Sequence, residues 1–180
     1  ANIAGLINTR TTSFRSMVVA DEKIKMAEVK AVESGYPIRG SLRTSNTLFG
    51  AEEIPAELPM SGKIWVDARL LQNLDVNLGE SIKLGESQFE ISKILNYEPD
   101  RGGDIFNIAP RLLMNAKDVE ATGLILPGSR VQYRLLLGGQ SDKISKFRAE
   151  IKNQDNLRVQ GIRDARPELK SALERAEQFL

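Results

Sequence analysis

Residues 63–96 read KIWVDARLLQNLDVNLGESIKLGESQFEISKILN and contain the clearest structural pattern in the chain. Residues 63–66 are a short apolar run that predicts a strand. Further along, residues 81–84 and 89–94 alternate apolar and polar side chains on either side of Gly85, which suits a turn because glycine tolerates positive φ. The middle of the chain is therefore expected to contain a strand followed by a β-hairpin.

Two short helices are expected between these strands and just after them. Asp67 can accept the free amide hydrogens at the start of a helix over residues 68–73, and Asn115 can do the same for residues 116–122. Elsewhere the patterns predict the end of a short helix over residues 3–11, strands over 14–20, 24–33, 110–114, 131–137 and 157–162, and amphipathic helices over 141–153 and 166–180.

Composition excludes several classes of function. The chain has 180 residues, with 25 Lys and Arg against 24 Asp and Glu, and the net charge of +1 argues against a dedicated nucleic-acid binder. It contains no His and no Cys, which excludes His-based triads, Cys nucleophiles, disulfides and nearly all zinc sites. An apolar content of 41% is typical of a globular protein.

Two loops suggest how the chain is divided. Residues 44–62 are rich in Pro, Gly, Ser and Asn and carry three glutamates, so they predict a boundary or a mobile flap. With a second Pro/Gly loop at 123–128, they flank an insert that splits a βα unit in two. The sequence therefore predicts an α+β fold with a second small domain inserted into the first. The last helical pattern reaches Leu180 without a terminating Gly or Pro, and we expect the native chain to continue.

Acidic residues after the hairpin are the first candidates for chemistry. Glu98 and Asp100, with Asp104, could form a carboxylate pair for acid–base catalysis, and the competing interpretation is a solvated polar loop between strands. No Gly-x-Ser-x-Gly elbow and no phosphate-binding Gly-rich motif occurs, so neither a serine hydrolase nor a nucleotide site is expected.

Single aromatic and basic residues give weaker indications. Trp65, the only tryptophan, is expected in the core rather than in a ligand site. Six scattered arginines are expected on the surface, solvated or paired, with contact to anionic lipid headgroups as the alternative. They are Arg39, Arg43, Arg101, Arg111, Arg130 and Arg134.

Several motifs together resemble the extracytoplasmic domain of MacB/FtsX-type ABC transporter permeases. The general pattern stands here as VDARLL at 66–71 and LGESIKLG at 78–85. Similarity to the YbbP-like branch rests on further stretches: EVKAV at 28–32, GYPIRG at 35–40, EPDR at 98–101, PRLLMN at 110–115, ATGLI at 121–125, PGSRV at 127–131, RDARPE at 163–168 and ALERAEQFL at 172–180.

The resemblance implies a fold like the MacB periplasmic core. In that fold a βα "porter" subdomain is interrupted by a β-rich "sabre" subdomain. We place the porter at residues 1–43 and 127–180 and the sabre at 44–126. The resemblance also implies a position on the periplasmic face of a bacterial inner membrane, between two membrane spans.

Function is likewise implied by the resemblance. A non-catalytic permease domain would relay ATP-driven motion and dock cargo or a periplasmic partner, with export or extraction of hydrophobic or lipid-like compounds as the transport role. No cofactor is expected on this chain, because a separate YbbA-like ATPase would bind ATP; a TesA-like esterase or lysophospholipase is a further expected partner. The candidate contacts are Phe49, Ile54, Leu58, Met60 and Arg101.

Two other functions remain open from the sequence. A freestanding lipid- or ligand-binding module would have a sizeable apolar pocket and no membrane spans beside it in its gene. A carboxylate hydrolase would use Glu98, Asp100 and Asp104.

Overall fold

The computed structural model describes residues 2–3, 5–100, 109–151 and 157–161. Within these residues none of the helices has the length and hydrophobicity needed to cross a membrane. The strands are β1 (Asn2–Ile3), β2 (Leu6–Ala20), β3 (Lys23–Val32), β4 (Arg43–Ser45), β5 (Lys63–Val66), β6 (Ser81–Leu84), β7 (Ser87–Tyr97), β8 (Arg111–Asn115) and β9 (Gln132–Gly138). The helices are α1 (Ala68–Leu74) and α2 (Ser141–Ile151), with 3₁₀ turns at Ala116–Asp118 and Glu120–Thr122.

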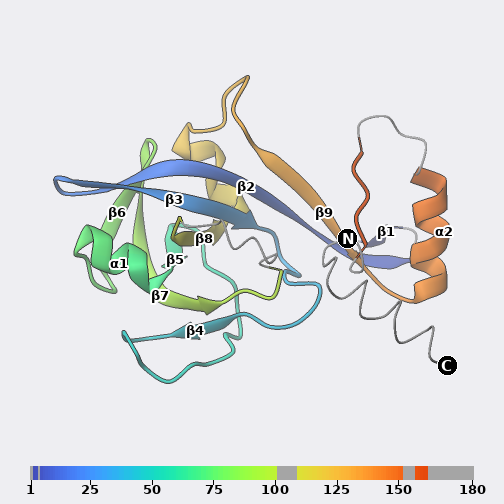
Figure 1. Cartoon of the computed structure of the whole chain (residues 1–180), viewed down its shortest axis with the longest axis horizontal. Coiled ribbons are helices and arrows are strands. Elements are labelled where there is room, and N and C mark those ends of the chain that lie inside the picture. Colours follow the sequence, from blue (N-terminus) through green and yellow to red (C-terminus); the bar gives the residue numbers. More distant parts are fainter. Residues whose placement is uncertain (1, 4, 101–108, 152–156, 162–180) are drawn as a thin grey trace, which may run out of the picture.

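Six of the strands close into a barrel. Hydrogen-bonded pairing runs from β2 to β3, β8, β5 and β7, and then through β6 back to β2. The β2–β3 hairpin is the longest part of this ring and extends across the molecule toward β9 and α2 (Figure 1). Closure leaves few unpaired strand edges, which stabilises a small β-structure.

The barrel encloses the main hydrophobic core. Its side chains alternate between inside and outside along each strand. Phe14, Val18, Val29 and Leu112 are among those that point inward, and Leu70, Leu71 and Leu74 of α1 join the same cluster. Asp67 accepts a hydrogen bond from the Arg69 amide at 2.9 Å, so the capping role predicted from the sequence is confirmed.

A second apolar cluster lies on the outer face of the barrel. We call it the exterior cluster; it comprises Val32, Tyr36, Leu42, Trp65, Leu95 and Leu113. Trp65 is 3% exposed, which confirms the prediction of a core role. Because Trp65 pairs with Leu113 across β5 and β8, the long connection after β3 packs onto the sheet at this point.

The start of the chain corrects one prediction. Residues 3–11 were expected to end a helix, but β1 and the first half of β2 occupy this region. Leu6 is fully buried while Ile7 is 60% exposed, and Thr9 and Thr11 pair with β9 on one side and lie close to β3 on the other. Tertiary pairing therefore overrides the local spacing of apolar residues, as it commonly does for strands.

The structure near the end of the chain corrects a second prediction. A strand was expected over residues 157–162, but 157–161 are described without strand pairing, and residue 162 lies outside the described residues. The helix expected over 166–180 also lies outside them. Helix α2 matches the amphipathic pattern, and its side chains are exposed or half-buried.

The division at residue 43 does not follow the barrel. Strands β2 and β3 belong to the segment assigned to the porter, yet they pair with β6 and β8 of the segment assigned to the sabre. Strand β9 and helix α2 lie beyond the barrel at the other end of β2 (Figure 1). The porter and sabre boundaries stay a prediction.

Candidate functional site

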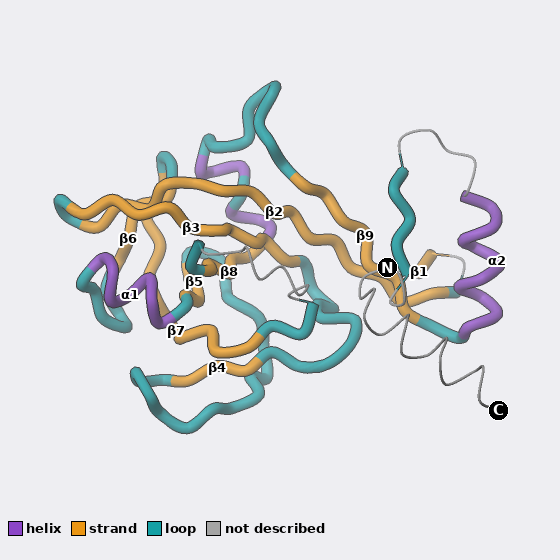
Figure 2. The backbone as a smooth tube through the Cα atoms, viewed as in Figure 1, coloured by secondary structure: helices purple, strands orange, loops and turns teal. Residues whose placement is uncertain are grey.

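The connection between β4 and β5 exposes large apolar side chains. Phe49 is 94% exposed, Ile54 69% and Met60 59%, whereas Leu58 is half-buried against the exterior cluster. We call residues 46–60 the docking loop, because they carry four of the five contacts that the resemblance predicts for a partner or cargo. Figure 2 shows it as irregular chain around the short strand β4. Arg101, the fifth candidate contact, lies outside the described residues.

The backbone at Phe49 is unusual for an aromatic residue. Its φ is +60°, and the amide of Gly50 donates a hydrogen bond to the Thr47 carbonyl at 3.1 Å, so residues 47–50 form a turn with Phe49 at its third position. That position requires positive φ in a type II turn and normally favours glycine. A bulky residue with positive φ is a strained outlier, and such outliers concentrate at functional sites.

The loop is held to the barrel at both ends. Glu53 and Thr44 exchange two backbone hydrogen bonds of 2.8 and 2.9 Å, and the Lys93 ammonium donates to the Glu53 carboxylate. This partner lowers the pKa of Glu53 below its ordinary value. At the other end, the Asn115 side chain donates to the Pro59 carbonyl at 3.0 Å. The apolar side chains are therefore presented by a fixed loop.

Two open hollows of about 340 Å³ each border the docking loop. One is lined by Phe49 and Glu52 of the loop, together with Asp67 and the end of β7. The other is lined by residues 55–60 over Trp65. Both lie at the small end of the range typical of ligand sites, roughly 300 to 1,000 Å³.

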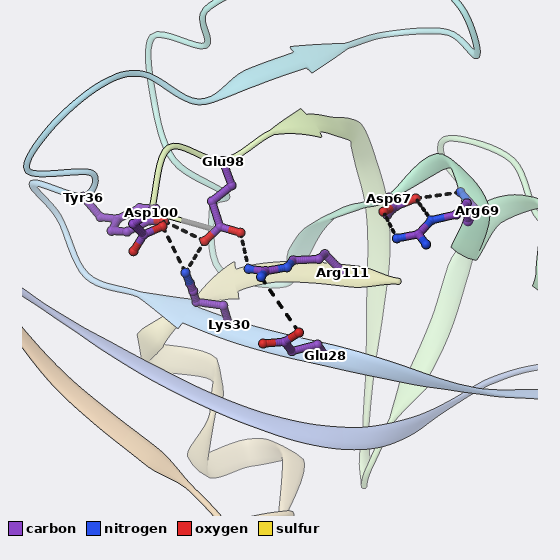
Figure 3. Close-up of polar contacts among 8 residues, drawn as sticks. All are labelled: Glu28, Lys30, Tyr36, Asp67, Arg69, Glu98, Asp100 and Arg111. Carbon is purple, nitrogen blue, oxygen red and sulfur yellow. Dashed lines mark hydrogen bonds and ion pairs between the residues drawn. The ribbon is translucent and has the colours of Figure 1, made fainter. Parts of the chain in front are cut away.

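A buried ion cluster lies beside the exterior cluster (Figure 3). Glu98 at the end of β7 is 3% exposed and accepts hydrogen bonds from Lys30 of β3, Arg111 of β8 and the Tyr36 hydroxyl. Asp100 also accepts hydrogen bonds from Lys30, at 3.1 Å, and from Tyr36. The cluster thus ties β3 and the connection after it to β8 and the end of β7, more than 60 positions away from Lys30 and Tyr36.

Burial and charge act in opposite directions within the cluster. Burial, followed by the neighbouring carboxylates of Glu98 and Asp100, raises the pKa of Tyr36 far above its ordinary value, so its hydroxyl stays protonated and donates. For Asp100 burial alone would raise the pKa, but the Lys30 ammonium and the hydrogen bonds outweigh it and lower the pKa.

The cluster settles what the carboxylates do structurally. Glu98 and Asp100 do lie together, but Glu98 is buried and both of its oxygens are engaged by cations, so the expectation of a solvated polar loop is wrong for it. Asp104 lies outside the described residues. Arg111 is 5% exposed, which corrects the expectation of a surface arginine.

Sequence reasoning missed the partners Lys30, Tyr36 and Glu28. Lys30 and Glu98 are 68 positions apart, and no local pattern indicates their contact. Glu28 occupies an ordinary polar position of a strand pattern, so the sequence does not single it out. In the structure its carboxylate lies 3.9 Å from the Arg111 guanidinium. The one available signal was that Lys30 stands within an otherwise apolar strand end.

Comparison with known proteins supports the resemblance. No protein-family model matches the chain. The chain is 32% identical over 178 residues to the uncharacterized ABC transporter permease YbbP of Escherichia coli strain K12; this covers 98% of the chain but only 21% of that protein. The resemblance to the YbbP-like permeases is therefore confirmed, and the chain spans about a fifth of this relative's length.

One solved structure supports the fold, and a second is less similar. The extracellular domain of the noncanonical ABC-type transporter YknZ from Gram-positive bacteria is similar with a TM-score of 0.54 and 9% identity, over 77% of this chain and 68% of that one. A domain of a permease protein from Porphyromonas gingivalis gives a TM-score of 0.49 and 15% identity, over 83% and 70% of the two chains.

Proposed function

We propose that this chain is the extracytoplasmic domain of a YbbP-type ABC transporter permease. Nearly the whole chain resembles one region of such a permease. It would lie on the periplasmic face of a bacterial inner membrane. The observation that carries this proposal is the 32% identity over 98% of the chain. The fold likeness to the extracellular domain of YknZ agrees with it.

The domain would relay motion and dock a cargo or a partner through the docking loop. A barrel with a closely packed core resists deformation, and the loop is tied to it through Glu53 and Pro59. A force on the loop would therefore move the barrel as a unit. ATP would be bound by a separate ATPase subunit, and no cofactor is proposed for this chain.

The exposed apolar side chains favour hydrophobic or lipid-like transport substrates, or a periplasmic partner such as an esterase or lysophospholipase. Phe49, Ile54 and Met60 expose apolar side chains on one loop, and apolar side chains that gather on one exposed surface mark interaction sites. A role in bond cleavage is not proposed, because the Glu98 carboxylate is buried and already paired with Lys30 and Arg111.

The freestanding binding module is the less favoured alternative. It requires a sizeable apolar pocket, whereas the two hollows of about 340 Å³ are open and small for a lipid carrier. The two proposals are separated by the hydropathy of the protein sequence that the gene encodes on both sides of this segment. A permease domain requires flanking membrane helices, each with about 20 mostly apolar residues.

The docking role is tested in the full-length permease assembled with its ATPase subunit. The double variant Phe49→Ser, Ile54→Ser removes two exposed apolar side chains without touching the core. We expect co-purification of the periplasmic esterase, or transport where it can be assayed, to fall at least fivefold. Leu126→Ser, at a side chain 64% exposed outside the loop, is the matched control and should leave both unchanged.

An unchanged association and unchanged transport in the double variant would contradict the docking role. Assembly of the permease with its ATPase should be intact in every variant, because the membrane region would mediate that contact.

A further inference from the structure

We infer that the docking loop binds a protein segment that presents a basic side chain next to an apolar one, and that it does not rest on an anionic lipid surface. This inference rests on the proposed docking role and narrows it to one class of partner. It follows from the charge of the loop, from the hollow beside Phe49 and from the way Phe49 is held.

The docking loop carries only negative charge. Residues 46–62 contain Glu52, Glu53 and Glu57 and no Lys or Arg. Arg43 lies 3.3 Å from Glu52 and Lys93 pairs with Glu53, yet 45% of each glutamate side chain stays exposed. Glu57 is also exposed. An anionic headgroup approaching this loop would be repelled, whereas a cationic side chain would be attracted.

The hollow beside Phe49 has a composition that fits a basic side chain. Glu52 contributes a carboxylate that stays partly exposed, and Ala68 and Leu95 contribute apolar surface. The second carboxylate of the hollow, that of Asp67, is already paired with Arg69. Lysine and arginine bury their methylene stems along apolar surface and keep the charged end beside a carboxylate. The Phe49 ring at the edge of the hollow adds a face on which a cation can rest.

Phe49 itself is suited to serve as the apolar anchor. Its ring is almost fully exposed, and the turn from Thr47 to Gly50 fixes the backbone below it. An aromatic side chain has only two rotatable bonds, so little conformational entropy is lost when a partner covers it. Buried aromatic anchors of this kind carry much of the binding energy at protein interfaces.

The inference is tested with a photo-crosslinking amino acid, p-benzoylphenylalanine, in place of Phe49 in the full-length permease in cells. We expect irradiation to yield an adduct with another protein, and mass spectrometry to place the crosslink within a few residues of a Lys or Arg. The same probe at Leu126 gives the background. A lipid adduct, or an adduct with a second copy of the permease, would overturn the inference while leaving a docking role for the loop.

Reversing one charge of the loop gives a second test, because a basic protein partner and an anionic lipid predict opposite changes in the adduct yield. In the probe-bearing permease, Glu52→Lys should lower the adduct yield at least fivefold if the partner is basic, and should raise the yield if the loop meets anionic lipid. Glu22→Lys makes the same charge change in the distant β2–β3 turn and should have no effect. An unchanged or increased yield in Glu52→Lys overturns the inference. An absence of any adduct above background overturns both it and the docking role.

Discussion

At the scale of single residues, Phe49 is proposed to contribute to binding while contributing little to stability. A positive φ costs a residue that has a side chain about 1–2 kcal/mol of stability, and Phe49 has a positive φ. Its ring adds little stability through burial, because Phe49 is 94% exposed. We therefore expect Phe49→Gly to leave the free energy of unfolding unchanged or to increase it by up to about 1 kcal/mol. Urea denaturation of the chain measures this.

The adjacent Leu48 provides the control. Leu48 is not among the residues with positive φ, so Leu48→Gly should lower the free energy of unfolding by about 0.5–1 kcal/mol through backbone entropy. Equal losses in the two variants would show that the turn does not strain Phe49.

Glu98 makes the opposite kind of contribution, because it is needed for stability. Replacing it with Gln removes the carboxylate that lies between Lys30 and Arg111, whose side chains are 5% and 6% exposed. Lys30 then keeps only the partly exposed Asp100, and Arg111 keeps only the more distant Glu28. Breaking a buried ion pair from one side costs about 3–5 kcal/mol, and we expect Glu98→Gln to lower the free energy of unfolding by that amount. Glu90→Gln, which breaks the exposed Lys63–Glu90 pair, should cost less than about 1 kcal/mol.

Asp100 makes the cluster sensitive to acid. Its pKa is lower in the folded chain than in the unfolded one, where it is about 3.9. The stabilisation is therefore fully present above about pH 4, and it is lost as the pH falls through the folded-state pKa. We expect Asp100→Asn to flatten the acid limb of a stability–pH profile measured between pH 6 and pH 2. A limb of the same slope in both proteins would contradict this.

Residue-scale features differ in how far the sequence predicts them. Asp67 and Asn115 act as caps in the way their position before apolar helical patterns indicates, because a cap contacts amides two residues away. The ion cluster could not be predicted, because Lys30 meets Glu98 only after the barrel has closed. Apart from Lys30, which stands within an apolar strand end, its members look like ordinary polar positions until the chain has folded.

At the scale of elements, the β6–β7 turn shows why one glycine matters more than another. Gly85 has φ +61°, and a Cβ there would lie 2.0 Å from the Thr122 carbonyl oxygen, because the turn packs onto the second 3₁₀ turn. We expect Gly85→Ala to lower the free energy of unfolding by at least about 2 kcal/mol, from the backbone strain and overpacking together.

Gly79 separates these two effects. Its φ is +87°, but a Cβ there would meet nothing within 4 Å. Gly79→Ala should therefore lower the free energy of unfolding by only about 1 kcal/mol. Thermal or urea unfolding of both variants checks the difference, and equal losses would mean that the contact with Thr122 is unimportant.

Element types were predicted best where pairing is local. The hairpin at 81–94 was predicted from alternation alone, because its two strands follow each other directly. The sequence predicts strand β2 correctly only over residues 14–20. Its first half is paired with β9, more than 120 positions away in sequence, so local spacing of apolar residues gave no reliable signal.

At the scale of the whole molecule, closure of the barrel depends on pairings between distant segments. Strand β3 pairs with β8, about 80 residues later, and β2 pairs with β6, about 65 residues later. An α+β composition can be predicted from the order of the elements, but no sequence pattern specifies these partners. Strands β2 and β3 therefore join the barrel through partners that lie far along the chain.

Unequal packing predicts unequal local stability across the molecule. Barrel side chains such as Val29 and Leu112 are fully buried, whereas the first four residues of β9 are exposed and no side chain of α2 is buried. Segments with few buried contacts open at lower free energy than the core. We therefore expect amide hydrogens of β9 and α2 to exchange at least tenfold faster than those of β3 and β8, measured by mass spectrometry under native conditions. Uniform exchange through all four elements would mean that the chain opens as one cooperative unit, and it would contradict the unequal local stability that the packing predicts.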